Sequence, residues 1–166
     1  MKRSPLKRKT GLKARTPLKG QKRHLGGLKR KKVRKVAKPK LTRLKKQLWE
    51  ECKRIIRLRY EKHTGGWDCY TCGNHLDAPA KAQTGHFIPS SVCSTEMRYD
   101  LGNLRVQCYR CNINLSGNWI EYEKRLRKEM GEDYPEKLKA RNESTKGLMY
   151  REDWYEMYLK NYKEIV

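Results

Sequence analysis

Two Cys-x-x-Cys pairs set the strongest constraint on how this chain can fold. CYTC spans residues 69–72 and CYRC spans residues 108–111, with 35 residues between the pairs. Two thiolates at this spacing can bind one tetrahedral metal ion, and Gly73 permits the tight turn that follows such a pair. We therefore predict a structural zinc site, with two disulfides or an iron–sulfur cluster as alternatives. Its four ligands would be Cys69, Cys72, Cys108 and Cys111.

Composition explains why a metal is needed. The chain has 166 residues, of which 36% are apolar, and it contains a single Phe. A core this small gains much from a bound ion, and a structural zinc contributes on the order of 10 kcal/mol to folding. Four thiolates leave no open coordination position, so this zinc should hold the fold and perform no chemistry.

The formal charge of +23 is very unevenly distributed. Residues 1–46 contain 21 Lys or Arg and no Asp or Glu, whereas the rest contains 20 basic and 18 acidic residues. A segment of like charges cannot bury enough apolar surface to fold alone. We predict a disordered basic tail at 1–40 that binds nucleic acid, and a folded domain at 41–166. A nuclear address, a ribosome-docking arm and a membrane-surface patch are the alternative uses of the tail.

No membrane or secretory signal is expected in this sequence. It contains no run of about 18 apolar residues, and its basic N-terminus lacks the apolar region of a signal peptide. The expected setting is a reducing cytosol, where paired cysteines bind metals more often than they form disulfides.

The apolar pattern predicts an α+β fold with one small hairpin. Leucines and isoleucines recur at helical spacing from Leu41 to Tyr60, with Thr42 as a possible N-cap and Gly65-Gly66 as the stop. In full, we predict helices at 41–63, 112–130, 135–142 and 151–164, and short strands around 86–88 and 104–106. The last helix carries an aromatic stripe, which indicates core packing or a dimer interface. That stripe consists of Trp154, Tyr155, Tyr158 and Tyr162.

Several motifs together resemble one protein family. GHFIPSS at 85–91, RYDLGNLRVQC at 98–108, the adjoining CYRCN, and SGN at 116–118 resemble the recombination proteins of the lambdoid phage NinG/Rap family. The resemblance covers about residues 45–165. It implies a structure-specific endonuclease for branched DNA such as Holliday junctions and D-loops, in the host cell cytoplasm. The order His86, Asn103, Asn112 within a zinc-clamped hairpin and helix is that of HNH (ββα-metal) nucleases, also described as treble-clef-like.

The HNH resemblance assigns a role to each of these three residues. It makes His86 the general base, because histidine titrates near neutral pH. It makes Asn103 the residue that holds the His86 loop, and Asn112 a ligand of a catalytic divalent cation, Mg²⁺. The simpler readings are a structural histidine, a turn residue and a helix cap. Cutting two strands symmetrically would favour a homodimer.

One position departs from the HNH pattern. Many HNH enzymes place Asp or His before the catalytic histidine as a metal ligand, but this chain has Gly85. Asp100 is a candidate replacement, although a turn-capping aspartate is the simpler reading. The departure favours a non-catalytic zinc-finger nucleic-acid-binding protein as the first alternative. An HNH endonuclease with another role is the second.

The remaining candidates are arginines and two extra cysteines. We expect Arg98, Arg105 and Arg110 to bind DNA phosphates or to be ordinary solvated charges. Cys52 falls on the apolar face of the first helix and is expected in the core, whereas the pattern assigns no role to Cys93.

Overall fold

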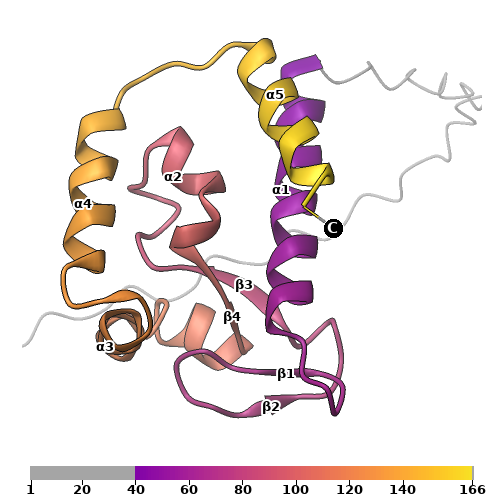
Figure 1. The fold of residues 1–166 in the computed structure, drawn as a ribbon, viewed down its shortest axis with the longest axis vertical. Coiled ribbons are helices and arrows are strands. Elements are labelled where there is room, and N and C mark those ends of the chain that lie inside the picture. Colours follow the sequence, from indigo (N-terminus) through magenta and orange to yellow (C-terminus); the bar gives the residue numbers. More distant parts are fainter. Residues whose placement is uncertain (1–39, 166) are drawn as a thin grey trace, which may run out of the picture. The chain divides into compact units, whose positions relative to one another are not determined.

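The computed structural model describes residues 40–165, so the predicted tail lies outside the described residues apart from Lys40. Figure 1 shows the order of the elements. These are helix α1 (Lys40–Tyr60), strands β1 (Trp67–Asp68), β2 (His75–Leu76) and β3 (Gln83–His86), helix α2 (Thr95–Tyr99), the 3-10 turn η1 (Leu101–Asn103), strand β4 (Leu104–Gln107), the π-helical turn η2 (Arg110–Asn114), and helices α3 (Trp119–Met130), α4 (Tyr134–Thr145) and α5 (Glu152–Lys163). Within the described part, every helix is too short or too polar to cross a membrane.

Helix α1 confirms the prediction of a long amphipathic helix, with different ends. Its buried face consists of Leu44, Leu48, Cys52, Ile55 and Ile56. The helix begins at Lys40, which forms ion pairs with Glu152 and Glu156 of α5. Thr42 therefore lies inside the helix, and the prediction that it is the N-cap was wrong.

Two antiparallel hairpins follow α1. Strands β3 and β4 pair with Gln83 opposite Gln107 and His86 opposite Leu104, which confirms the predicted hairpin. The second hairpin pairs β1 with β2. Two-residue strands have no periodicity to detect, so the sequence indicated only a turn at this place.

The prediction of one continuous helix at 112–130 was wrong. The π-helical turn η2 ends at Asn114, and α3 begins only at Trp119. Between them, Ser116, Gly117 and Asn118 all have positive φ, at 49°, 91° and 49°. Three successive left-handed residues cannot continue a right-handed helix, because each one turns the backbone the opposite way.

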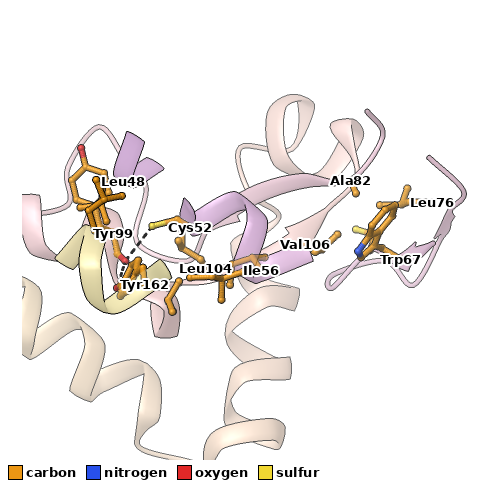
Figure 2. Close-up of a cluster of buried hydrophobic side chains, with 14 of the residues drawn as sticks. Leu48, Cys52, Ile56, Trp67, Leu76, Ala82, Tyr99, Leu104, Val106 and Tyr162 are labelled. Atoms are coloured by element: carbon orange, nitrogen blue, oxygen red, sulfur yellow. Dashed lines mark hydrogen bonds between the residues drawn. The ribbon is translucent and has the colours of Figure 1, made fainter. Parts of the chain in front are cut away.

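The aromatic stripe of α5 packs inside the chain. Helices α5 and α1 lie side by side (Figure 1), and the stripe also meets Tyr99 of α2. Tyr162 donates a hydrogen bond to the Tyr99 carbonyl at 2.7 Å, and the Cys52 thiol donates to the same oxygen (Figure 2). The core interpretation of the stripe and of Cys52 is therefore confirmed, and the buried Tyr155 and Tyr162 are not available to a partner.

A second buried cluster lies on the other side of the hairpin, between the loop after β3 and helices α2, α3 and α4. Its members are Phe87, Ile88, Met97, Tyr122, Leu126 and Leu138. The partly buried Cys93 packs against it. The strand that carries His86 is thus held between two cores.

Candidate metal centre and active site

The four cysteines of the two pairs converge as predicted. Their Sγ atoms all lie within 4.8 Å of one another, and Cys72 Sγ is 3.8 Å from Cys108 Sγ. Zn–S bonds of about 2.3 Å in a tetrahedron place sulfurs about 3.8 Å apart, so the cluster fits a zinc ion. None of the six cysteines of the chain forms a disulfide.

Backbone turns shape each half of this cluster. Gly73 has φ of 76° and donates its N–H to the Cys69 carbonyl, which confirms the predicted tight turn. In the second half, the backbone N–H of Cys111 donates to Cys108 Sγ at 3.4 Å. Such donors stabilise thiolates, the form in which cysteine binds a metal.

His86 ends strand β3 and faces helix α1. Its ring stacks on Trp49, with ring centroids 5.2 Å apart and planes 14° from parallel. Its Nε2 lies 3.1 Å from the Arg98 carbonyl oxygen. A carbonyl can only accept, so Nε2 carries the ring proton and Nδ1 is left as an acceptor. None of residues 40–165 forms a hydrogen bond with Nδ1.

The surroundings of His86 keep its ring neutral. Burial, with a smaller effect of the Arg98 charge, lowers the pKa of His86 to about 4, although the bond to the Arg98 carbonyl acts in the opposite direction. The neutral ring has an open nitrogen that can accept a proton, but a pKa of about 4 makes it a weaker base than the near-neutral histidine expected from the sequence.

A cavity of about 390 Å³ opens beside His86. It is lined by Lys45, Lys46, Trp49, His86, Ser90, Arg98 and Tyr99. Among residues 40–165, three cationic side chains and no carboxylate line this cavity, which suits a phosphate. Arg98 was predicted as a phosphate contact, whereas the sequence reading missed the contributions of α1. The available signal was Trp49, a large aromatic residue outside the apolar stripe of its helix.

Asn103 is fully buried under the loop that follows His86. Its Oδ1 accepts from the Ile88 backbone N–H at 2.8 Å, and its Nδ2 donates to the Met97 carbonyl at 3.0 Å. Its own carbonyl accepts from the Phe87 N–H. These bonds tie the loop after His86 to α2 and β4, which is the contact that the resemblance implies.

Asn112 is held against strand β3. Its Nδ2 donates to Gln83 Oε1 at 2.8 Å, at the far end of strand β3. Asn112 sits in η2 and does not cap α3, whose N-cap position is Asn118.

The space above Gly85 is filled by another residue. A Cβ at position 85 would lie 1.9 Å from Oε1 of Gln107. Gln107 is fully buried, and its Nε2 donates to the Gly117 carbonyl and to the Thr71 hydroxyl. Its Oε1 accepts no hydrogen bond in the described part of the chain. No spacing or local pattern in the sequence marks Gln107.

Amide oxygens are the side-chain groups here that could coordinate a hard cation such as Mg²⁺. Asn112 and the unpartnered Gln107 carry such oxygens, which hard cations accept as ligands. Asp100 instead accepts from the Gly102 N–H and pairs with Arg141. Its turn-capping interpretation is therefore correct.

The two other candidate arginines differ in burial. Arg105 is buried, pairs with Glu129 and donates to the Gly102 and Leu104 carbonyls. It also lies over the ring of Tyr70. It braces the hairpin, so both alternatives expected for Arg105, a phosphate contact and a solvated charge, were wrong. Arg110 is exposed at the start of η2.

Comparison with known proteins gives one family. No curated protein and no solved structure matches the chain significantly. The family model described as bacteriophage lambda NinG protein matches residues 1–165. This match covers nearly the whole sequence and agrees with the resemblance drawn from the motifs. The chain belongs to the NinG family.

Proposed function

We propose that this protein is a metal-dependent DNA endonuclease of HNH type that cuts branched recombination intermediates such as Holliday junctions and D-loops. The observation that carries the proposal is His86, a neutral histidine with one nitrogen fixed and the other free. It opens onto a cavity lined by Lys45, Lys46 and Arg98. Membership of a phage recombination family supports a nucleic-acid substrate.

In this mechanism the side chains of Lys45, Lys46 and Arg98 hold the phosphate of the scissile bond. Nδ1 of His86 then takes a proton from the attacking water, while Nε2 stays bonded to the Arg98 carbonyl and fixes the ring. Asn103 acts as a positioning residue, because it binds the backbone of the loop after His86 and does not contact the ring. The stack on Trp49 limits rotation of the ring.

The proposal includes a catalytic divalent cation, Mg²⁺, which the HNH resemblance implies. Asn112 is the residue that the resemblance assigns to this cation, and its amide oxygen would hold it together with phosphate oxygens of the DNA. When bound, a divalent cation polarises the phosphate and stabilises the leaving oxygen. The structural zinc remains outside this chemistry.

The basic residues at the start of the chain would add to the affinity for DNA. We assign residues 1–40 to nucleic-acid binding, because each phosphate neutralised by Lys or Arg releases a counterion. A homodimer would place two His86 sites on the two strands of a junction.

One observation favours a second function. Within the described part of the chain, no carboxylate lines the cavity beside His86, and Gln107 fills the space where a ligand at position 85 would lie. A zinc-built protein that binds nucleic acid without cutting it would have the same fold and charge.

The deciding experiment is cleavage of a labelled four-way junction and a linear duplex of matched length. Wild type, His86→Ala and the control His63→Ala would be tested with Mg²⁺, with Mn²⁺ and without added metal. His63 is exposed and serves as a matched histidine. We expect metal-dependent cutting of the junction by wild type and His63→Ala, and a loss of about 100-fold or more in His86→Ala.

Other outcomes separate the alternatives. Equal cutting of junction and duplex would retain the nuclease but remove its branch specificity. Tight binding without cutting under all three conditions would leave the non-catalytic binding protein.

A further inference from the structure

An unusual share of the exposed apolar surface lies in one short segment. In residues 109–120, five large apolar side chains are 44–63% exposed. They are Tyr109, Ile113, Leu115, Trp119 and Ile120. Exposed apolar side chains that concentrate in one part of a protein mark a candidate binding surface. We call residues 109–120 the apolar segment.

The apolar segment is held in shape by several contacts. It begins within the second cysteine pair, so the metal site fixes its first residues. Its central Gly117 donates to the carbonyls of Cys111 and Asn112, and the Gly117 carbonyl accepts from Gln107. Ser116 and Asn118 keep the left-handed conformation on either side. Non-glycine residues in this region store strain, which clusters at functional sites.

The segment adjoins the strand that carries His86. Gly117 lies against the His86 carbonyl, since a Cβ built at Gly117 would be 3.7 Å from that oxygen. Asn112 bonds to Gln83 at the other end of the same strand. A ligand on the apolar segment would therefore lie beside the His86 strand.

The charges and amides of the segment favour DNA as its ligand. No Asp or Glu occurs between Asp100 and Glu121 in the sequence, so nothing in this stretch repels phosphate. Arg110 and three asparagines alternate with the apolar residues. Guanidinium and amide groups bind phosphates and base edges, and aromatic rings stack on bases.

We propose that the apolar segment binds unstacked DNA bases, with Tyr109 and Trp119 as stacking residues and the aliphatic residues as a wedge beside them. In a regular duplex each base face is covered by its neighbours. At a branch point, or where strands separate, these faces become available. The proposal rests on the proposed function for the kind of DNA, and it specifies which surface would distinguish a branch from a duplex.

The test measures binding in the full-length His86→Ala protein, so that cleavage cannot intervene. Fluorescence anisotropy would compare a forked DNA bearing unpaired bases with a blunt duplex of equal length. The variant is Tyr109→Ala/Trp119→Ala, and the control is Leu58→Ala/Met149→Ala, which removes two exposed apolar side chains elsewhere. Trp119→Phe keeps an aromatic ring at the same position. Circular dichroism and zinc content would verify that each variant is folded.

We expect the aromatic double variant to bind the fork about ten-fold or more weakly, with little change for the duplex. The control and Trp119→Phe should bind the fork like the parent protein. Equal weakening on fork and duplex, or no weakening, would overturn the proposal. Conversion of a dimeric parent to a monomer, seen by sedimentation, would overturn it in favour of an interface between two copies.

Failure of the two proposals can be told apart. If wild type cuts no DNA but the double variant loses fork binding, the nuclease proposal fails and the base-binding surface stands. If wild type cuts junctions and the double variant binds every DNA normally, the nuclease stands and the base-binding surface fails.

Discussion

The two faces of the β3–β4 hairpin differ in what they do with polar residues. Side chains alternate along a strand, so His86 and Leu104 face α1, whereas Gly85 and Arg105 face α3. On the α1 face, His86 keeps one ring nitrogen free and opens onto a basic cavity. On the α3 face, Arg105 is buried and fully engaged with carbonyls and Glu129.

The comparison shows that burial, and not residue type, decides which of these side chains support the fold and which are free to bind a ligand. Arg98 and Arg105 belong to the same sequence motif. One lines the cavity, and the other braces the strand that positions it. The same division separates the half-buried His86 from the fully buried Gln107 on adjoining strands.

The largest effect should come from breaking the cluster of four cysteines. Cys108→Ser breaks the tetrathiolate cluster, and a structural zinc contributes on the order of 10 kcal/mol, more than a domain of this size can lose. We expect loss of the cooperative melting transition in circular dichroism, together with loss of bound zinc. Cys93→Ser, which lies outside the cluster, should melt like wild type. A stable, zinc-free Cys108→Ser protein would contradict the zinc assignment.

Arg105→Met and Arg98→Met should differ most clearly in how much they lower the free energy of unfolding. Arg105→Met removes the donor to the Gly102 and Leu104 carbonyls, so we expect a loss of about 3 kcal/mol in the free energy of unfolding. Its matched partner Arg98→Met should change that free energy by less than about 0.5 kcal/mol, since Arg98 is exposed. Chemical denaturation and DNA affinity would both be measured. The comparison fails if Arg105→Met weakens DNA binding more than Arg98→Met does.

Gly85→Ala tests the contact between Gly85 and Gln107. The new methyl would displace Gln107 Oε1, and such overpacking destabilises by about 1–3 kcal/mol. Because the clash needs both side chains, Gly85→Ala should cost less in a Gln107→Ala background. A double-mutant cycle in urea measures this coupling, which we expect to exceed about 0.5 kcal/mol. Additive effects would show that Gln107 does not occupy that space.

The smallest predicted effect is a shift in pH dependence on the α1 face. The base works when deprotonated, and burial lowers the pKa of His86 to about 4, from 6.5 for an ordinary histidine. The kcat/KM for cleavage should therefore stay level from neutral pH to about 5 and fall only as the pH approaches 4. Trp49→Leu exposes the ring, so its acid limb should move up toward 6.5. Identical profiles for the two proteins would remove Trp49 as the cause of the shift.

The free energy of unfolding should also fall as the pH is lowered, because the ring of His86 must become protonated. His86 has a lower pKa in the folded chain than its ordinary value, so its contribution is complete above pH 6.5 and is lost as the pH falls toward 4. His86→Asn should melt with less sensitivity to pH in this window, because an amide does not titrate there.

The sequence by itself determined the parts that depend on local spacing. The cysteine pairs specified the cysteine cluster, the apolar and aromatic repeats specified α1 and α5, and the motifs around His86 indicated the NinG family. Within each cysteine pair, each repeat and each motif, the residues lie within a few positions of one another. Helical and strand periodicities and metal-ligand spacing act over that range.

Only the tertiary structure decided which residues meet across elements. It placed Trp49 and two lysines of α1 beside His86, buried Arg105, and put Gln107 into the space above Gly85. It also broke the expected helix at Gly117, whose carbonyl accepts from Gln107. These contacts join residues far apart in the chain, so local patterns do not encode them. Packing selects them, because each buried polar group needs a partner and each filled space excludes another side chain.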